Sequence, residues 1–109
     1  MRLSVERAAN NQVLFREVNE RISELAEQRS EDSPGLFVCE CSHVACAEVL
    51  DVSPAEYEAV RANGSHFLIT PGHELEGIER VVEQNARFAV VEKLDRAALI
   101  ATSNDPRHA

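Results

Sequence analysis

Hydrophobic residues recur every three or four positions in the first long segment of the chain, with charged residues between them. The recurring positions are Leu14, Val18, Ile22 and Leu25. This spacing places apolar side chains on one face of an α-helix. We therefore expect an amphipathic helix over residues 11–29, capped by Asn10 or Asn11 at its start. The polar residues 30–35, with proline and glycine at the end, predict a loop.

The apolar stripe of this helix is narrow, with Phe15 beside it. It could pack on the rest of the domain, or it could pair with a helix of a protein partner or of a second copy. We expect packing on its own domain, because most helices of globular proteins are stabilised in this way. The partner helix or self-association is the alternative.

Several short runs after the loop are rich in β-branched and aromatic residues. They predict strands at residues 36–38, 49–52, 67–70, 78–83 and 87–93. Residues 84–86 separate the last two runs and predict a hairpin loop. In the last strand, apolar residues occupy both alternating sets, Phe88 with Val90 and Ala89 with Val91. We expect that strand to be buried on both faces.

One further helix has a clear start signal. Ser53 stands at the capping position, Pro54 follows it, and Glu56 lies three residues after the serine. This is a capping box with proline at the first helical position, where its missing N–H costs nothing. We expect a helix over residues 53–63, ended by a left-handed residue at Asn63–Gly64.

Together these elements predict one α+β domain over residues 1–93. An N-terminal helix is followed by a small, mostly antiparallel sheet that is interrupted by one inserted short helix. Residues 94–109 form a C-terminal extension with one or two helical turns, and we expect residues 103–109 to be disordered.

The composition of the chain limits its possible partners and cellular location. The chain has 109 residues, with 19 acidic and 11 basic ones and a net charge of −8. Such a surface repels phosphate, so no nucleic acid partner is expected. No apolar run has the length of a membrane span and the N-terminus lacks a signal-peptide core, so we expect a cytoplasmic protein without membrane contact.

Candidate chemistry is concentrated in three cysteines, Cys39, Cys41 and Cys46, which are the only ones in the chain. An odd number of thiols cannot all pair within the chain, and cytoplasmic thiols stay mostly reduced. Thiolates this close can converge on one soft cation. The cluster therefore predicts a zinc site, which would also stabilise a core that has few large side chains.

Structural zinc is tetrahedral, so three thiolates leave one ligand to find. His73 follows a Pro71–Gly72 turn at the end of a predicted strand, and a second loop of this kind is the usual way to complete a site. His43, inside the cysteine cluster, is the alternative, although the backbone would have to fold very tightly to present it. Water or an acidic side chain is a third option.

The chain resembles a small bacterial family that has no established activity. The resemblance covers roughly residues 11–93. It is carried by Phe37-Val38-Cys39-Glu40-Cys41 with Cys46, by Glu56-Tyr57-Glu58-Ala59-Val60-Arg61, by Pro71-Gly72-His73-Glu74 and by Val90-Val91-Glu92-Lys93. It implies a metal-binding fold in which Cys39, Cys41, Cys46 and His73 act as one set, and it implies no substrate.

Three functions remain in consideration. The first is a protein-interaction or regulatory module held by structural zinc, and we favour it. The second is a redox sensor that releases zinc when its thiols are oxidised, which requires an exposed cluster. The third, a zinc-dependent hydrolase, is less favoured because thiolate-rich zinc activates water poorly and the usual hydrolase motifs are missing. Glu40 and Glu74 are expected to be solvated acids.

Overall fold

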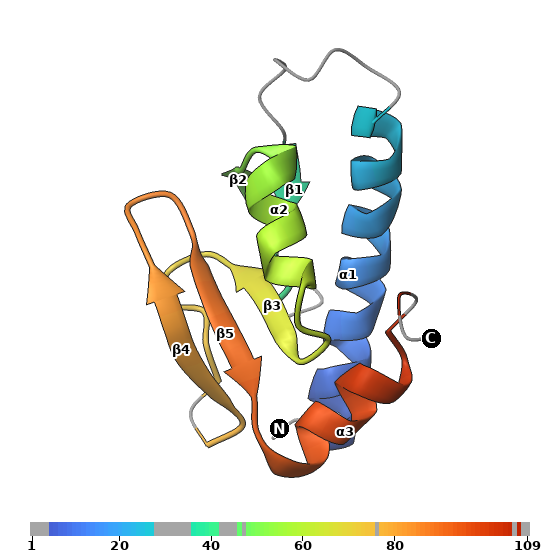
Figure 1. Cartoon of the computed structure of the whole chain (residues 1–109). Helices are drawn as coiled ribbons and strands as arrows, with labels where there is room; N and C mark the ends of the chain where they lie inside the picture. Colours follow the sequence, from blue (N-terminus) through green and yellow to red (C-terminus); the bar gives the residue numbers. More distant parts are fainter. Residues whose placement is uncertain are drawn as a thin grey trace.

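The computed structural model of the chain describes residues 5–27, 36–41, 46, 48–75, 77–105 and 107. Their fold is α+β, as predicted (Figure 1). The elements in chain order are α1 (Val5–Glu27), β1 (Leu36–Val38), β2 (Val49–Asp51), α2 (Pro54–Arg61), β3 (His66–Ile69), β4 (Glu79–Gln84), β5 (Ala89–Lys93) and α3 (Asp95–Ser103).

The strands form two antiparallel sheets. β1 pairs with β2 in a two-stranded ribbon, while the other three are ordered β3-β5-β4 with β5 in the middle. In Figure 1, α1 runs along one side of the molecule and α3 crosses it near its N-terminal end, and α2 lies against β3. The predicted single sheet is therefore two sheets, both antiparallel.

The central strand β5 is buried on both faces, as predicted. Phe88 and Val90 lie on the face nearer α2, and Ala89 and Val91 lie on the opposite face. On that opposite face, Val91 pairs with Phe67 of β3, and the guanidinium of Arg16 in α1 lies 4.7 Å from the Phe67 ring centroid. The core is thus enclosed between α1 and α3 on one side and α2 on the other.

α1 is longer at its N-terminus than predicted, because it spans Val5–Glu27 rather than residues 11–29. Asn10 and Asn11 lie inside the helix and do not cap it. Residues 6–9 are Glu-Arg-Ala-Ala, which have high helix propensity, and this preference outweighs the weak capping signal of asparagine. The predicted loop at 30–35 lies outside the described residues.

The face of α1 that packs on the domain is also not the predicted one. Leu14, Val18 and Leu25 are 62%, 48% and 48% exposed, and of the four predicted stripe residues Ile22 alone contacts the core. The buried face lies on the other side of the helix. It consists mainly of the polar residues Gln12, Arg16, Asn19 and Ser23, together with Val13.

Polar side chains can be buried on this face because the rest of the fold supplies their partners. Arg16 donates to the carbonyl oxygens of Gly64 and Ala101 at 2.8 and 2.7 Å. Gln12 donates to Glu79, which also forms a buried ion pair with Lys93 at 2.7 Å. Buried hydrogen-bonding groups that find partners in this way avoid the large cost of desolvation.

α2 begins as predicted. The Ser53 hydroxyl accepts from the Glu56 N–H at 3.1 Å, and the Glu56 carboxylate accepts from the Ser53 N–H at 3.0 Å, which completes the capping box. The predicted left-handed ending is wrong, because neither Asn63 nor Gly64 has a positive φ. Gly64 serves close packing instead: a Cβ there would lie 2.7 Å from an Asp105 carboxylate oxygen.

Residues after 93 pack on the domain. α3 contacts both α1 and β5, and Asp105 forms an ion pair with Arg61. Arg107 donates to the carboxylates of Glu20 and Glu58, at 2.9 and 2.5 Å for the closest atoms. Residues 103–105 and 107 are thus attached to α1 and α2, through the carboxylates of Glu20 and Glu58 and the guanidinium of Arg61.

We predict that the inverted packing of α1 is measurable. Leu14→Gln or Val18→Gln should change the free energy of unfolding by less than about 0.5 kcal/mol, because both side chains are exposed. Arg16→Leu should lower it by roughly 1.5–3 kcal/mol, since two carbonyl oxygens lose a charged donor. Urea unfolding followed by circular dichroism measures these changes. Equal losses for Leu14→Gln and Arg16→Leu would contradict the packing described.

Candidate metal centre

Four potential metal ligands converge where the end of β1 meets the turn after β3. The donor atoms of Cys39, Cys41, Cys46 and His73 all lie within 4.8 Å of one another. Nδ1 of His73 is 3.7 Å from Sγ of Cys39 and 3.8 Å from Sγ of Cys46. In tetrahedral coordination with Zn–S near 2.3 Å and Zn–N near 2.0 Å, neighbouring ligand atoms are about 3.5–3.8 Å apart. The group therefore has the dimensions needed to hold one metal ion.

The cysteine segment is held by backbone hydrogen bonds on both sides. The Cys39 N–H donates to the Glu48 carbonyl at 3.0 Å, which continues the β1–β2 ladder one step past Val38 and Val49. The Glu40 N–H donates to the Leu68 carbonyl at 2.7 Å. The first two cysteines are thus attached to β2 and to the outer edge of β3.

His73 is brought to the site by a tight turn. Pro71 and Gly72 occupy the central turn positions, Gly72 has φ of +94°, and the His73 N–H donates to the Thr70 carbonyl at 3.0 Å. Proline followed by a glycine of positive φ is the pattern of a type II turn. The predicted tight turn at Pro71–Gly72 is therefore confirmed, and it places His73 beside Cys39 and Cys46.

Electrostatics at Cys39 suit a bound cation. Burial raises the pKa of the Cys39 thiol, and the side chain and backbone of Thr70 oppose this rise. The Thr70 N–H points at Sγ from 3.1 Å. A positive ion at the centre would reverse the effect of burial, since metals bind the thiolate form. An N–H donor toward sulfur then stabilises the negative charge on the ligand.

Glu40 lies between two cysteines, but its side chain points away from them. Its carboxylate is fully buried and accepts from the Asn19 amide at 2.8 Å, the Tyr57 hydroxyl at 3.0 Å and the Leu68 N–H at 2.9 Å. Burial raises the pKa of the Glu40 carboxyl, and these donors oppose the rise. The prediction that Glu40 is a solvated acid is therefore wrong.

This arrangement joins three elements to the cysteine segment. Asn19 comes from α1, Tyr57 from α2 and Leu68 from β3. Asn19 also exchanges hydrogen bonds with the backbone of Val38, donating to its carbonyl and accepting from its N–H, each at 2.8 Å. Sequence reasoning did not connect Asn19 or Tyr57, the chain's single tyrosine, with Glu40, because no local pattern links these residues.

Two other residues that the sequence analysis considered for the site, His43 and Glu74, are not among the four ligands that cluster in the described part of the chain. His43 lies outside the described residues. Glu74 follows His73 but is not part of the four-ligand group, and one of its carboxylate oxygens is buried without a hydrogen-bond partner among the described residues. Glu74 is half-buried rather than fully solvated.

The comparisons with known proteins identify no relative. No protein-family model, no curated protein and no solved structure matches the chain. The resemblance to a bacterial metal-binding family therefore stays a prediction. Within the described residues, none of the helices combines the length and the apolar character that crossing a membrane requires.

We predict that Glu40→Gln lowers the free energy of unfolding by roughly 1–3 kcal/mol. All three partners of the carboxylate donate to it, so the NH2 group of glutamine would face a donor with no acceptor. Glu48→Gln is the matched control, because Glu48 is an exposed acid on the strand partner of Cys39. Urea unfolding at a fixed metal concentration compares the two variants, and equal stability would contradict the buried role of Glu40.

Proposed function

We propose that the cluster of Cys39, Cys41, Cys46 and His73 binds one zinc ion and that this zinc is structural. The supporting observation is the convergence of the four donor atoms within 4.8 Å. Three thiolates and one imidazole are soft and borderline ligands, and such a ligand set favours zinc over the harder divalent cations. The predicted family has the same ligand set, and we propose the chain as a member of it.

A structural role follows from the closed ligand set. Four protein donors leave no coordination position for water, whereas catalytic zinc keeps one open. The bound ion would connect the end of the β1–β2 ribbon to the turn after β3, which belong to two different sheets. A hydrolase remains the lesser alternative. It would need one ligand to leave, and Glu74 beside His73 would be its general base.

A redox sensor is the second alternative, and burial speaks against it. Cys39 and Cys41 are 2% and 0% exposed, while reactive thiols are usually accessible. A disulfide between Cys39 and Cys41 would also span one residue and be strained. Release of the metal by mild peroxide in proportion to dose, with recovery on reduction, would favour the sensor over structural zinc.

We predict that about one zinc ion per chain copurifies with the protein. Cys39→Ser, Cys41→Ser and Cys46→Ser should each abolish zinc binding and most of the folded structure, since metal binding and folding are coupled. His73→Ala should weaken zinc binding far more than His43→Ala in a competitive chelator titration. A serine variant with full zinc content and an unchanged melting temperature would show that its cysteine is not a ligand, and the converse histidine ranking would place His43 in the site.

We further propose that this zinc-held domain works as a cytoplasmic protein-interaction module and that α1 is its binding surface. The exposed row of Leu14, Val18 and Leu25 lies on the side of α1 turned away from the domain. Apolar residues at this spacing suit an amphipathic helix that packs alongside. This exposed row therefore supports the alternative from the sequence analysis, in which the apolar stripe of α1 binds a helix of a partner.

The charges beside the row indicate the chemistry of the partner. Glu17 and Glu24 flank it, and Arg21, within the row, is 3.6 Å from Glu24 and mostly exposed. A second copy would bring these carboxylates together and would itself carry a net charge of −8. We therefore favour a helix of another protein whose apolar stripe is flanked by Lys or Arg.

We predict that a synthetic amphipathic helix with leucines at this spacing and lysine flanks binds the zinc-loaded protein, while the same peptide with glutamate flanks does not. Leu14→Gln/Val18→Gln should weaken binding about tenfold or more, because two apolar contacts are lost. Leu99→Gln is the control, since Leu99 is 70% exposed on α3. Calorimetric titration and sedimentation velocity measure the outcome. Binding of neither peptide, or self-association that the double variant abolishes, would contradict a basic partner helix.

A further inference from the structure

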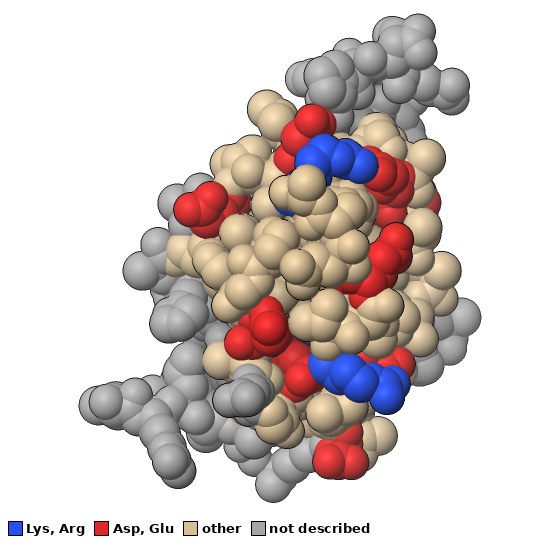
Figure 2. Space-filling view, turned by 90° about the vertical axis from the view of Figure 1, so that its left-hand side faces the viewer, with Lys and Arg blue, Asp and Glu red and all other residues tan. Residues whose placement is uncertain are grey.

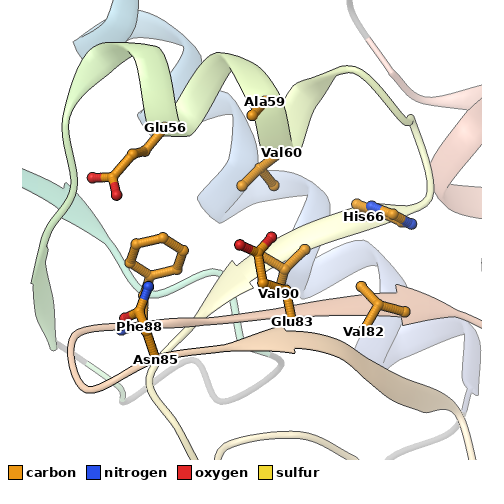
Figure 3. A pocket seen from close by; sticks show the side chains of 9 residues that line it. All are labelled: Glu56, Ala59, Val60, His66, Val82, Glu83, Asn85, Phe88 and Val90. Atoms are coloured by element: carbon orange, nitrogen blue, oxygen red, sulfur yellow. Dashed lines mark hydrogen bonds between the residues drawn. The ribbon is translucent and has the colours of Figure 1, made fainter.

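A cavity of about 390 Å³ lies between α2 and the face of the sheet formed by β4 and β5 (Figure 3). Its walls are mainly apolar: Ala59, Val60, Val82, Phe88 and Val90. Val60, Phe88 and Val90 are at most 4% exposed, so they form the floor, whereas Val82 is 42% exposed at the rim. Pockets for small ligands have volumes of about 300–1,000 Å³, and this one lies at the lower end of that range.

An irregularity in β4 determines which side chains enter the cavity. Val81 pairs with Val91 and Glu83 pairs with Val90, so Val82 is an extra residue in the strand, a β-bulge. Without the bulge, Val82 and Glu83 would point to opposite faces of the sheet. With it, both line the cavity, and in Figure 3 both side chains project toward α2.

The charged groups around the cavity are largely neutralised, with one exception. Glu56 is paired with Arg87 at 2.6 Å, and hydrogen bonds from Arg87 lower the pKa of Glu56 to about 2. At the other end, His66 is 3.3 Å from Glu92, which also pairs with Arg80. Glu56, His66 and Glu92 therefore each already have an ion-pair or hydrogen-bond partner.

Glu83 is the exception. Its carboxylate forms no hydrogen bond or ion pair within the ranges that the structure describes, although it stands over an apolar floor. Figure 2 shows that the face on the β4 side of the molecule carries acidic side chains around mostly uncharged residues, with basic side chains lying against acidic ones. The local field therefore favours a positive ligand.

We propose that this cavity binds a small organic monocation, an ammonium group on an apolar body, with the ammonium at Glu83 and the apolar part on Val60, Phe88 and Val90. One unpaired carboxylate matches one positive charge, and the apolar floor accounts for the rest of the ligand. The same chemistry is offered by a free hydrophobic amine and by the lysine side chain of a peptide. This site is independent of the proposed zinc site and of the α1 surface.

The test uses three probes of similar size on the zinc-loaded protein at low ionic strength: phenethylamine, 2-phenylethanol and phenylacetate. Chemical shifts of the methyl groups of Val60, Val82 and Val90 report binding. We expect saturable shifts with the amine, binding about fivefold weaker or more with the alcohol, and none with the acid. Equal binding of amine and alcohol would overturn the proposal, as would an absence of shifts with the amine.

The matched variant moves the charge without changing the net charge. Glu83→Gln/Gln84→Glu places the carboxylate on the next residue of β4, which does not line the cavity. It should bind the amine no better than the alcohol. Retention of the amine preference would overturn the role of Glu83.

Two further arms identify how the cavity works. Ala59→Leu should abolish amine binding, because Ala59 lines the cavity and is exposed, so the larger side chain can enter it with the fold intact. Amine binding unchanged in Ala59→Leu would overturn the assignment to this cavity. An acetylated peptide with one lysine between leucines separates the two sources: tighter binding of the peptide assigns the cavity to a protein segment, and tighter binding of the amine assigns it to a small molecule.

Discussion

Side chains alternate in direction along Cys39–Cys41. This alternation lets one short segment contribute to the metal-ligand cluster on one side and to the packing of the helices on the other. The two sulfur atoms face the turn that carries His73, and the Glu40 carboxylate faces α1, α2 and β3. Neither the cysteine cluster nor the buried Glu40 carboxylate is stable without partners. Thiolates packed together need a cation, and a buried carboxylate needs donors. Three residues of chain therefore couple a metal-sized cluster to the polar contacts that place both major helices.

The same dependence on polar partners explains the orientation of α1. Its inner face consists largely of residues that a solvent-exposed helix would normally display, and each of them makes a defined contact, as Arg16 does with two carbonyl oxygens. Charge-assisted hydrogen bonds in a desolvated setting are strong and directional. They hold the helix in one position and leave its apolar row, with Leu14 the most exposed member, available at the surface.

The proposed activities use different parts of the molecule. Zinc would stabilise the junction of the ribbon and the sheet, α1 would present a partner surface, and the bulge at Val82 opens a small cavity over the far end of the sheet. A small domain with a lean core has little stability to spare, so a metal that contributes folding energy is physically useful to it. Its surface features can then serve recognition without being needed for packing.

The sequence alone determined the elements whose signals are local. The capping box at Ser53 specifies the start of α2 and the Pro71–Gly72 pair specifies a turn, because in each case neighbouring residues carry the physical cause. The close spacing of the three cysteines indicates a ligand cluster for the same reason, whereas His73 joins that cluster from a separate turn after β3. Hydrophobic periodicity also located α1 except for its first turns, and the runs of β-branched and aromatic residues located the strands closely.

Tertiary structure decided which face of α1 is buried and where Glu40 points. A periodic pattern shows that a helix has two faces, but the buried one is chosen by the partners available across the fold, and for Asn19 and Arg16 those partners lie 19 to 85 residues away. The register shift that directs the Glu83 side chain toward the cavity likewise depends on the pairing of β4 with β5. Contacts between distant residues have no signature in local sequence, so they became visible only when the chain was folded.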